Sequence, residues 1–341
     1  MSTDIFSYAI GIGTQNSAGR WLEVFYPQPV FRPAAGEVER FAESAGYSGG
    51  NVAIELSPAQ LSALAEQLPD TQAALANTVC QSSSPVVLTI IANDEAITST
   101  PEAYLKLHLL SLRHVRPNEM NLEGIFAQLP NVAWTSRGAM DPEEVTAAQL
   151  QARMAGEVLE ITAIDKFPRM TNYVIPGGVR IAHSARVRLG AYLGEGTTVM
   201  HEGFINFNAG TDGPNMVEGR LSQGVVMGAG SDLGGGASTM GTLSGGGQIV
   251  LSVGRDCLIG ANGGTGIPLG DRCTIEAGLY ITASTLVQVF DADRNFVRQV
   301  KARELAGQSD MLFIRNSSTG HVECRTNKNA ITLNEELHAH N

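Results

Sequence analysis

The chain has 341 residues, a formal net charge of −11 and 43% hydrophobic residues. This composition excludes an intrinsically disordered chain, and the negative charge argues against nucleic acid as a partner. The length predicts two domains, or one domain joined to a long repeat. The first residues lack a basic, apolar leader, and no apolar run approaches the roughly 20 residues of a membrane span. We therefore expect a cytoplasmic protein with no membrane partner.

The cysteines show no spacing typical of a metal site. They stand at Cys80, Cys257, Cys273 and Cys324. In a chain without a leader, this pattern favours free thiols in a reducing cytoplasm.

The first 166 residues have the mixed helix and strand signals of an α/β domain. Strands are predicted at 21–26, 51–56 and 86–92, and helices are predicted to start at Ser57-Pro58, Thr100-Pro101 and Asp141-Pro142. Ser57 is a good N-cap, and Pro58 suits the first helical turn. Pro69 should stop that helix. No catalytic signature occurs here, so we expect a packing or oligomerisation role.

From about Phe167 the pattern changes to a period of six residues. Aliphatic residues and one threonine stand six apart in three runs: Ile181, Val187, Leu193, Val199 and Ile205; Leu221, Met227, Leu233 and Thr239; Leu269, Ile275, Ile281 and Val287. A period of six fits neither a helix nor a two-sided strand. One strand and one turn per hexapeptide, with three hexapeptides in a coil of roughly 18 residues, predict a left-handed parallel β-helix over 167–289.

Two interruptions of the period, near Gly210–Asn215 and Ser244–Gly247, predict loops that leave the coil. Loops on a rigid scaffold are frequent sites of function. Beyond 289 we expect a C-terminal extension, 290–341, with a strand pair around Asp291–Asn295 and a strand at Ser309–Arg315.

Several segments are more specific than the repeat. They are TNYVIPGGVRIA (171–182), VRLGAYL (187–193), TTVMHEGFINFNAG (197–210), MVEGRL (216–221), SDLGGGASTMGTLSGG (231–246), LGDRCTIEAGLYIT (269–282) and VKAREL (300–305). In them the chain resembles the 2,3,4,5-tetrahydropyridine-2,6-dicarboxylate N-succinyltransferases, also called tetrahydrodipicolinate N-succinyltransferases, of lysine and diaminopimelate biosynthesis. The resemblance is to the branch found in actinobacteria and some pseudomonads, and it is strong over 173–317 and weak in the N-terminal domain.

The resemblance implies a homotrimer with active sites in the clefts between adjacent β-helices. It also implies a small-molecule substrate, a cyclic dicarboxylate imine that is hydrated and opened to an amino-oxo-pimelate. The amine of this compound attacks the thioester of succinyl-CoA.

The family's acidic catalytic residue corresponds to Glu218 in MVEGR. Two roles suit a carboxylate there: a general base that takes the proton of the attacking amine, or a nucleophile that forms an acyl-anhydride. We favour the base, because an amine attacks a thioester without a covalent step on the enzyme. Arg220 shares a strand face with Glu218, and the resemblance places it on succinyl-CoA, where a guanidinium suits the succinyl carboxylate.

The substrate brings two more carboxylates, and Arg180, Arg186 and Arg188 are candidates to bind them. For CoA, the resemblance implies a row of mostly small residues and a basic end. These positions are Gly235, Ser238, Ala261, Glu276, Ala277, Ser284, Lys301, Arg315, Asn316 and Ser317, the last three of which lie in the stretch Ile314–Ser317. Lys301 and Arg315 would neutralise CoA phosphates.

Related enzymes hold a magnesium ion on the trimer axis with an Asp and a Glu. The Glu corresponds to Glu202, and the Asp position is Ala185. Losing one carboxylate per subunit weakens a site for a hard cation. His183 and His201 lie 18 residues apart, about one coil, and should stack on one face. A zinc site would need a third imidazole, which the repeat lacks; His201 is also an alternative general base.

Two other functions remain open from the sequence. One is another CoA-dependent acyltransferase, acting on an amino acid or a sugar-nucleotide amine. The other is a non-catalytic trimeric β-solenoid scaffold, in which replacing Glu218 by Gln would change only a surface charge.

Overall fold

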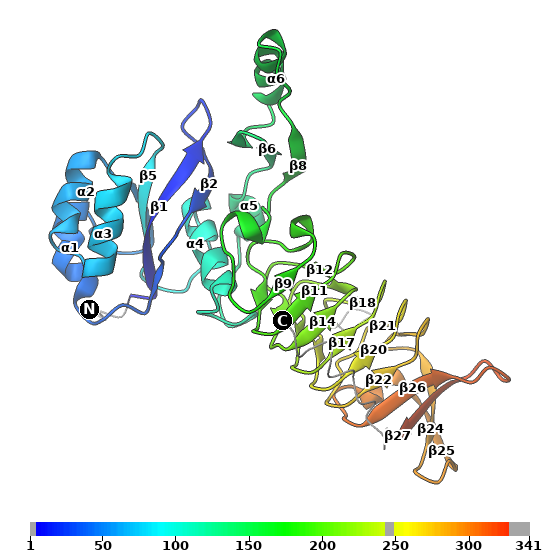
Figure 1. Cartoon of the computed structure of the whole chain (residues 1–341). Coiled ribbons are helices and arrows are strands. Elements are labelled where there is room, and N and C mark those ends of the chain that lie inside the picture. Colours follow the sequence, from blue (N-terminus) through cyan, green and yellow to red (C-terminus); the bar gives the residue numbers. More distant parts are fainter. Residues whose placement is uncertain (1–4, 243–248, 327–341) are drawn as a thin grey trace. The chain divides into compact units, whose positions relative to one another are not determined.

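The computed structural model describes residues 5–242 and 249–326. The chain forms two compact units, and Figure 1 shows the elements of each. The first unit comprises Met1–Leu109, Glu119–Pro168 and Asn172–Val174, and the second comprises Leu110–Asn118, Arg169–Thr171 and Ile175–Asn341. The predicted interruption at Ser244–Gly247 lies outside the described residues.

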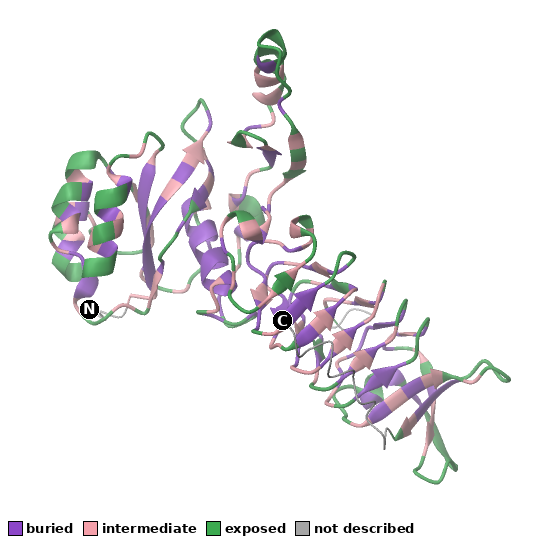
Figure 2. Cartoon of the chain, viewed as in Figure 1, coloured by how far each residue is buried: buried purple, intermediate pink, exposed green. Residues whose placement is uncertain are grey.

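The first unit is built on an antiparallel sheet with strand order β2-β1-β5-β4, and β3 also pairs with β1. Its strands are β1 (Ser7–Gln15), β2 (Trp21–Phe25), β3 (Val30–Phe31), β4 (Val52–Glu55) and β5 (Val86–Ile91). Helices α1 (Glu37–Ala45), α2 (Pro58–Ala65) and α3 (Asp70–Val79) cover one face, and α4 (Thr100–Ser111) covers the other (Figure 1). Figure 2 shows that the sheet and α4 are largely buried.

The core of this sheet follows from the apolar positions of its elements. Phe41 of α1 and Leu64 of α2 are buried against Ile10 and Leu88 of the central strands. Ser57 caps α2 as expected and forms a capping box with Gln60. Pro69 does end that stretch, but it also immediately precedes α3, a helix that we did not predict.

A smaller antiparallel sheet, order β7-β6-β8, completes the first unit with two helices. The elements are α5 (Ile125–Gln128), β6 (Val132–Thr135), β7 (Gly138–Met140), α6 (Val145–Met154) and β8 (Ile161–Asp165). The helix predicted from Asp141 begins at Val145, because Asp141 caps a turn instead: its carboxylate accepts a hydrogen bond from the Glu143 amide, 3.1 Å.

The second unit contains the predicted β-helix. Two- and three-residue strands pair in parallel along its three faces. One face carries β10 (Tyr192–Leu193), β13 (Gly210–Thr211), β16 (Val226–Met227) and β19 (Ser252–Val253). The second carries β9 (Arg180–Ile181), β11 (Thr197–Val199), β14 (Asn215–Val217), β17 (Asp232–Leu233), β20 (Leu258–Ile259) and β22 (Thr274–Ile275). The third carries β12 (Phe204–Ile205), β15 (Arg220–Leu221), β18 (Ser238–Thr239), β21 (Gly264–Thr265) and β23 (Tyr280–Ile281).

The residues at period six point inward as predicted. Val199, Val217, Leu233, Ile259 and Ile275 form one stack on the second face, and each is 0% exposed. Burying one such aliphatic side chain contributes about 1.5–3 kcal/mol, so stacked coils supply one continuous core.

The expected loop at Gly210–Asn215 was wrong. Gly210 belongs to β13 and Asn215 to β14, and both strands pair with the neighbouring coils, so this stretch stays within the helix. Its Gly and Pro residues form a corner instead, in which Gly213 has a φ of 58°. The shift of frame comes later, between Val217 and Leu221, which are four residues apart.

After β23 the chain leaves the coil in two strand pairs. β24 (Leu286–Phe290) and β25 (Phe296–Lys301) form the hairpin predicted around Asp291–Asn295. β26 (Met311–Arg315) pairs with both β22 and β27 (Val322–Thr326). Short 3₁₀ turns occupy Met170–Asn172, Ser184–Arg186 and Ala302–Leu305.

The cysteines are present as free thiols, and three of them are buried. Within the described residues, no helix combines the length and the apolar character needed to cross a membrane.

Candidate active site

One corner of the β-helix joins the second face to the third, and one of its turns is shorter than the others. Four residues make the turn in most coils: Met200–Gly203, Gly234–Ala237, Gly260–Gly263 and Glu276–Leu279. Between β14 and β15 the turn has two residues, Glu218 and Gly219. The strands on both sides stay in register with their neighbours. The turn at Glu218 and Gly219 is therefore two residues shorter than the turns of the neighbouring coils.

Backbone hydrogen bonds align these turns into one column. The amide of Met200 donates to Val217, that of Glu218 to Leu233, and those of Gly234 and Gly260 to the coils beyond, at 2.8–2.9 Å. Gly219 is required by this closeness, because a Cβ at that position would press into the carbonyl oxygen of Ala237. The sequence thus places its acidic residue in the tightest turn of the column.

Glu218 lies against the glycine turn of the following coil. Its side chain is half-buried, and its Oε2 is 3.7 Å from the position that a Cβ on Gly235 would occupy. Any side chain larger than hydrogen at 235 would line this carboxylate. Gly235 leaves the carboxylate facing open space along the column.

Arg220 begins the strand that follows the short turn. It pairs with Phe204 on one side and with Ser238 on the other, and its exposed side chain points away from the core, whereas Leu221 points inward. Its Nη2 donates to the Ser238 Oγ, 2.9 Å. The structure therefore brings together Glu218, Arg220, Gly235 and Ser238 from two adjacent coils.

The expected small residues continue along the same column. Ala261 and Ala277 are exposed in the turns that follow Gly234–Ala237. Glu276, at the start of the last of these turns, accepts a hydrogen bond from the Arg315 amide, 2.7 Å, which connects the column to β26. The small side chains of Gly235, Ala261 and Ala277 form a lane, which ends beside the basic residue Arg315.

The remaining expected positions lie at the end where the chain leaves the coil. Ser284 and Lys301 are exposed, and the Ala302 amide binds the Thr285 carbonyl oxygen, 2.9 Å, which holds the two segments together. Asn316 stabilises its own turn, because its carboxamide accepts from the Ser318 and Thr319 amides and donates to Glu323. Ser317 is exposed in the same turn.

A cluster of charged residues lies one coil before Glu218. Glu202 accepts a hydrogen bond from His201, 2.9 Å, and forms an ion pair with Arg186, 2.7 Å. The His201 hydrogen bond, with Arg186, holds the pKa of the exposed Glu202 carboxyl below its usual value. The rings of His183 and His201 stack edge to face with centroids 5.3 Å apart, as their spacing predicted.

These residues do not fit a divalent cation within one chain. Both oxygens of Glu202 are engaged by side chains, and Ala185 offers no ligand. Within the part of the chain that the structure describes, no group of three or more His, Cys, Asp or Glu side chains is placed to hold a metal ion. We derive no chemical step through a metal.

Several groups with large pKa shifts lie in the first unit. Burial lowers the pKa of His108 to about 4 and raises the pKa of Tyr104 and of Tyr173 well above the usual value. Burial also raises the pKa of Glu23, against hydrogen bonds from Thr14 and Tyr173 that lower it. These groups pack among one another and hold the fold.

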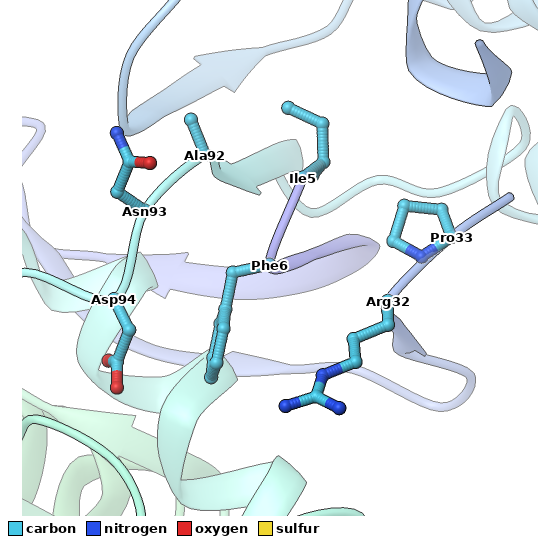
Figure 3. A pocket seen from close by; sticks show the side chains of 7 residues that line it. All are labelled: Ile5, Phe6, Arg32, Pro33, Ala92, Asn93 and Asp94. Atoms are coloured by element: carbon cyan, nitrogen blue, oxygen red, sulfur yellow. The ribbon is translucent and has the colours of Figure 1, made fainter. Parts of the chain in front are cut away.

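A pocket of the first unit opens between the ends of β1, β3 and β5 (Figure 3). Arg32 and Asp94 extend on either side of Phe6 in this view. The Asp94 carboxylate forms an ion pair with the fully buried side chain of Lys106, 2.8 Å away, and so helps to stabilise the fold. None of the expected site residues lines this pocket.

Sequence reasoning missed two features of the site. The first is the short turn itself, which the four-residue spacing of Val217 and Leu221 would have disclosed. The second is a group of amide side chains beside the third face, Asn118, Asn206 and Asn208, which line a cavity with Ser222 and Gln223. Asparagines in turns carry no signal of their own.

A stacked β-helix with a carboxylate and an arginine at a shortened corner is the arrangement expected of a hexapeptide-repeat transferase. Comparisons with known proteins agree. Family models for the tetrahydrodipicolinate N-succinyltransferase N-terminal and middle regions match residues 60–127 and 129–169, and the model of the hexapeptide repeat of succinyl-transferase matches 250–283.

Relatives match over the full length. The 2,3,4,5-tetrahydropyridine-2,6-dicarboxylate N-succinyltransferase of Pseudomonas putida is 62% identical over 100% of both chains, and that of Vibrio cholerae is 53% identical over 98% of this chain and 99% of its own. A solved structure from Campylobacter jejuni, named as a 2,3,4,5-tetrahydropyridine-2-carboxylate N-succinyltransferase, has a TM-score of 0.89 at 30% identity and covers 96% of this chain and 94% of its own. The chain therefore belongs to the 2,3,4,5-tetrahydropyridine-2,6-dicarboxylate N-succinyltransferase family, enzymes with a left-handed β-helix.

Proposed function

We propose that this protein transfers the succinyl group of succinyl-CoA to the amine of ring-opened tetrahydrodipicolinate, 2-amino-6-oxopimelate, in the lysine and diaminopimelate pathway. The names of its relatives supply the reaction. The observation that carries the proposal is the two-residue turn, which sets Glu218 beside Gly235 and next to the Arg220–Ser238 pair. An acid and a cation then lie together at one corner of the coil.

Glu218 acts as the general base. The amine nitrogen attacks the carbonyl carbon of the thioester, a C–N bond forms, and the C–S bond breaks. The proton lost by the amine goes to the Glu218 carboxylate, and CoA leaves as a thiolate that takes up a proton. The alternative is a succinyl anhydride on Glu218. Incubation with succinyl-CoA in the absence of amine, followed by hydroxylamine, distinguishes them: we expect no hydroxamate at Glu218.

Arg220 binds the free carboxylate of the succinyl group. Its guanidinium is already held by the Ser238 hydroxyl, so little side-chain entropy is lost when the carboxylate arrives. This arrangement explains a preference for succinyl over acetyl donors, because an acetyl group has no carboxylate to bind.

The CoA arm follows the lane of small residues, Gly235, Ala261 and Ala277, whose short side chains leave room beside the turns. Glu276, Ser284, Asn316 and Ser317 border this lane or its end. Lys301 and Arg315 are exposed and basic, as the CoA phosphates require.

The assembly and location follow the family expectation. The enzyme works as a homotrimer in the cytoplasm, with a catalytic β-helix over 167–289, an N-terminal domain over 1–166 and an extension over 290–341. Sedimentation equilibrium tests the trimer.

The activity is tested with purified protein, succinyl-CoA and either tetrahydrodipicolinate or 2-aminopimelate, by following CoA release. We expect turnover with succinyl-CoA and at least about 100-fold less with acetyl-CoA, because the bidentate carboxylate contact is lost. Absence of succinylated product with both amines contradicts the proposal. Equal rates with both thioesters would favour a general CoA-dependent acyltransferase.

A further inference from the structure

The pocket of the first unit has the size and composition of a small-molecule site, and the proposed acyl transfer does not use it. Its volume is about 570 Å³, within the range of about 300–1,000 Å³ that is typical of such sites. Its lining combines apolar residues with polar and charged ones, among them Ile5, Phe6, Pro33, Arg32, Asn93 and Asp94 (Figure 3).

Three segments of the chain meet at this pocket, each next to the end of a strand. Phe6 precedes β1, Arg32 follows β3, and Ala92 follows β5. The Phe6 amide donates to the Ile91 carbonyl oxygen, 3.0 Å, and the Phe6 carbonyl oxygen accepts from the Arg32 amide, 2.9 Å. Backbone hydrogen bonds therefore hold the pocket wall on both sides of Phe6.

Arg32 presents a guanidinium on one side of Phe6. Its φ of 50° lies in the left-handed region, which is uncommon for a residue with a long side chain. Its Cζ lies 5.0 Å from the centre of the Phe31 ring, which meets the Phe6 ring edge to face with centroids 5.3 Å apart. Among the described residues, no carboxylate pairs with this side chain. A guanidinium that stacks on an aromatic ring can still bind a carboxylate through its N–H groups.

Asp94 presents a carboxylate on the other side of Phe6 (Figure 3). Its Oδ1 accepts from the Lys106 Nζ, 2.8 Å, and its Oδ2 accepts from the Asn121 amide, 2.9 Å. The Lys106 side chain is 0% exposed, and it also donates to the carbonyl oxygens of Glu95 and Asn121, so all three of its N–H donors have partners. Because the Asp94 side chain is 25% exposed, a ligand in the pocket would meet the negative end of this ion pair.

Asn93 adds a polar group next to Asp94. Its backbone is fixed by Asn51: the Asn93 amide donates to the Asn51 Oδ1, 3.1 Å, and the Asn93 carbonyl oxygen accepts from the Asn51 Nδ2, 3.0 Å. The Asn93 side chain is exposed and forms no hydrogen bond within the described residues. Its carboxamide oxygen is therefore available to accept a hydrogen bond from a ligand.

We propose that this pocket binds a zwitterionic amino acid with an apolar side chain. The ligand's carboxylate binds Arg32, its ammonium group binds Asp94 and the Asn93 Oδ1, and its side chain packs against Phe6 and Pro33. A simple anion would be repelled by Asp94 and a simple amine by Arg32, whereas a zwitterion matches both charges. The exposed Arg32 side chain is long enough to approach a ligand that is anchored at Asp94.

The charge requirement is tested by ligand-observed NMR titration of the full-length protein. L-leucine is compared with 4-methylpentanoate, which lacks the ammonium group, and with 3-methylbutylamine, which lacks the carboxylate. We expect L-leucine to bind with a Kd below about 1 mM and each analogue to bind at least about 10-fold more weakly, since each loses a charge-assisted contact. L-methionine and L-phenylalanine extend the range of side chains.

The assignment of Arg32 is tested with the same amino acids. Arg32→Gln should weaken the binding of L-leucine by about 10- to 100-fold, and Arg32→Lys, which keeps the charge without the planar fork, should lose less. Arg40→Gln is the matched control, because it removes the same charge from an exposed position of α1 that does not line the pocket. It should bind like the wild type.

Three results would overturn the proposal. The first is that none of the three amino acids binds at millimolar concentration. The second is that 4-methylpentanoate or 3-methylbutylamine binds as tightly as L-leucine, which would show a site for a single charge. The third is wild-type affinity in Arg32→Gln, or an equal loss of affinity in Arg40→Gln.

Discussion

The first unit and the short turn of the β-helix place their ionisable side chains differently. In the first unit, His108, Tyr104 and Tyr173 are buried together, and burial moves their pKa values far from the ordinary range. In the β-helix, Glu218 and Arg220 lie at the surface of a shortened turn. Strongly shifted pKa values often mark active sites, but in the first unit they mark a packed core. The corner that carries Glu218 is distinguished by its turn length.

This contrast has a structural cause. In a repeated coil the turns of a column are equivalent, and one of them can be two residues shorter while the strands around it keep their register. The first unit has no repeat, and its buried polar groups must satisfy one another. The candidate site residues Glu218 and Arg220 therefore lie where the chain departs from the repeat.

Lengthening the short turn should have the largest effect. Insertion of two glycines between Glu218 and Gly219 gives the turn the length of Gly234–Ala237, so the coils should still stack. The carboxylate would move away from Gly235 and Arg220, and we expect kcat/KM to fall by at least about 100-fold, as misplaced catalytic groups do.

The same insertion in the exposed Asp291–Asn295 turn of the β24–β25 hairpin is the control, and it should leave the rate nearly unchanged. Circular dichroism and thermal unfolding check the fold of both variants. Wild-type activity in the lengthened Glu218 turn would show that turn length does not position the base.

The buried His108 should make the stability of the first unit depend on pH. Its pKa is lowered to about 4 in the folded state, whereas an unfolded histidine titrates near 6.5. Between these values the unfolded chain binds a proton that the folded chain excludes. Stability should therefore be complete above about pH 6.5 and fall as pH decreases towards 4, by on the order of 3 kcal/mol.

Urea unfolding followed by tryptophan fluorescence measures this, because both tryptophans, Trp21 and Trp134, lie in the first unit. His108→Gln should flatten the pH dependence, and His183→Gln, on the β-helix surface, should not. An unchanged slope in His108→Gln would assign the acid sensitivity to other groups.

Substitutions at two neighbouring glycines should distinguish an effect on CoA binding from an effect on the stability of the fold. Gly235 has space for a Cβ, with Glu218 Oε2 nearest at 3.7 Å, so Gly235→Ala should fold normally and crowd only the CoA arm. We expect about a tenfold higher KM for succinyl-CoA, the effect of about 1–3 kcal/mol of overpacking.

Gly236 has a φ of 70°, and a Cβ there would collide with the Asn262 side chain. Gly236→Ala should therefore cost about 1–2 kcal/mol of unfolding free energy and change KM little. If Gly235→Ala leaves the KM for succinyl-CoA unchanged, the lane does not run past this residue.

The repeat was predictable because inward residues are chosen for one property, burial, at a fixed interval. Leu233 and Ile275 are fully buried, and this interval identifies both of them in the sequence. The interruption was misplaced at Gly210–Asn215 because Gly and Pro serve equally in loops and in corners, and composition does not distinguish the two. The helix at Asp70–Val79 was missed for a similar reason, since Pro69 both ends one helix and precedes another.

The site was predictable only in part. The family resemblance named Glu218 and Arg220, and the structure sets them with Gly235 and Ser238. It did not rank Arg180, Arg186 and Arg188 as partners of the substrate carboxylates, because their neighbours lie on other coils, as Glu202 does beside Arg186. The register between coils decides which side chains become neighbours, and the local sequence does not specify this register.

The role of the shortened turn is tested most directly by the turnover of Glu218→Gln, measured with succinyl-CoA and 2-aminopimelate beside Glu195→Gln, an exposed residue of another corner. Loss of the general base should lower kcat by about 10³-fold in Glu218→Gln, with thermal stability and oligomeric state unchanged, while Glu195→Gln stays at the wild-type rate. A Glu218→Gln enzyme with wild-type kcat would contradict the assignment of the chemistry to the shortened turn.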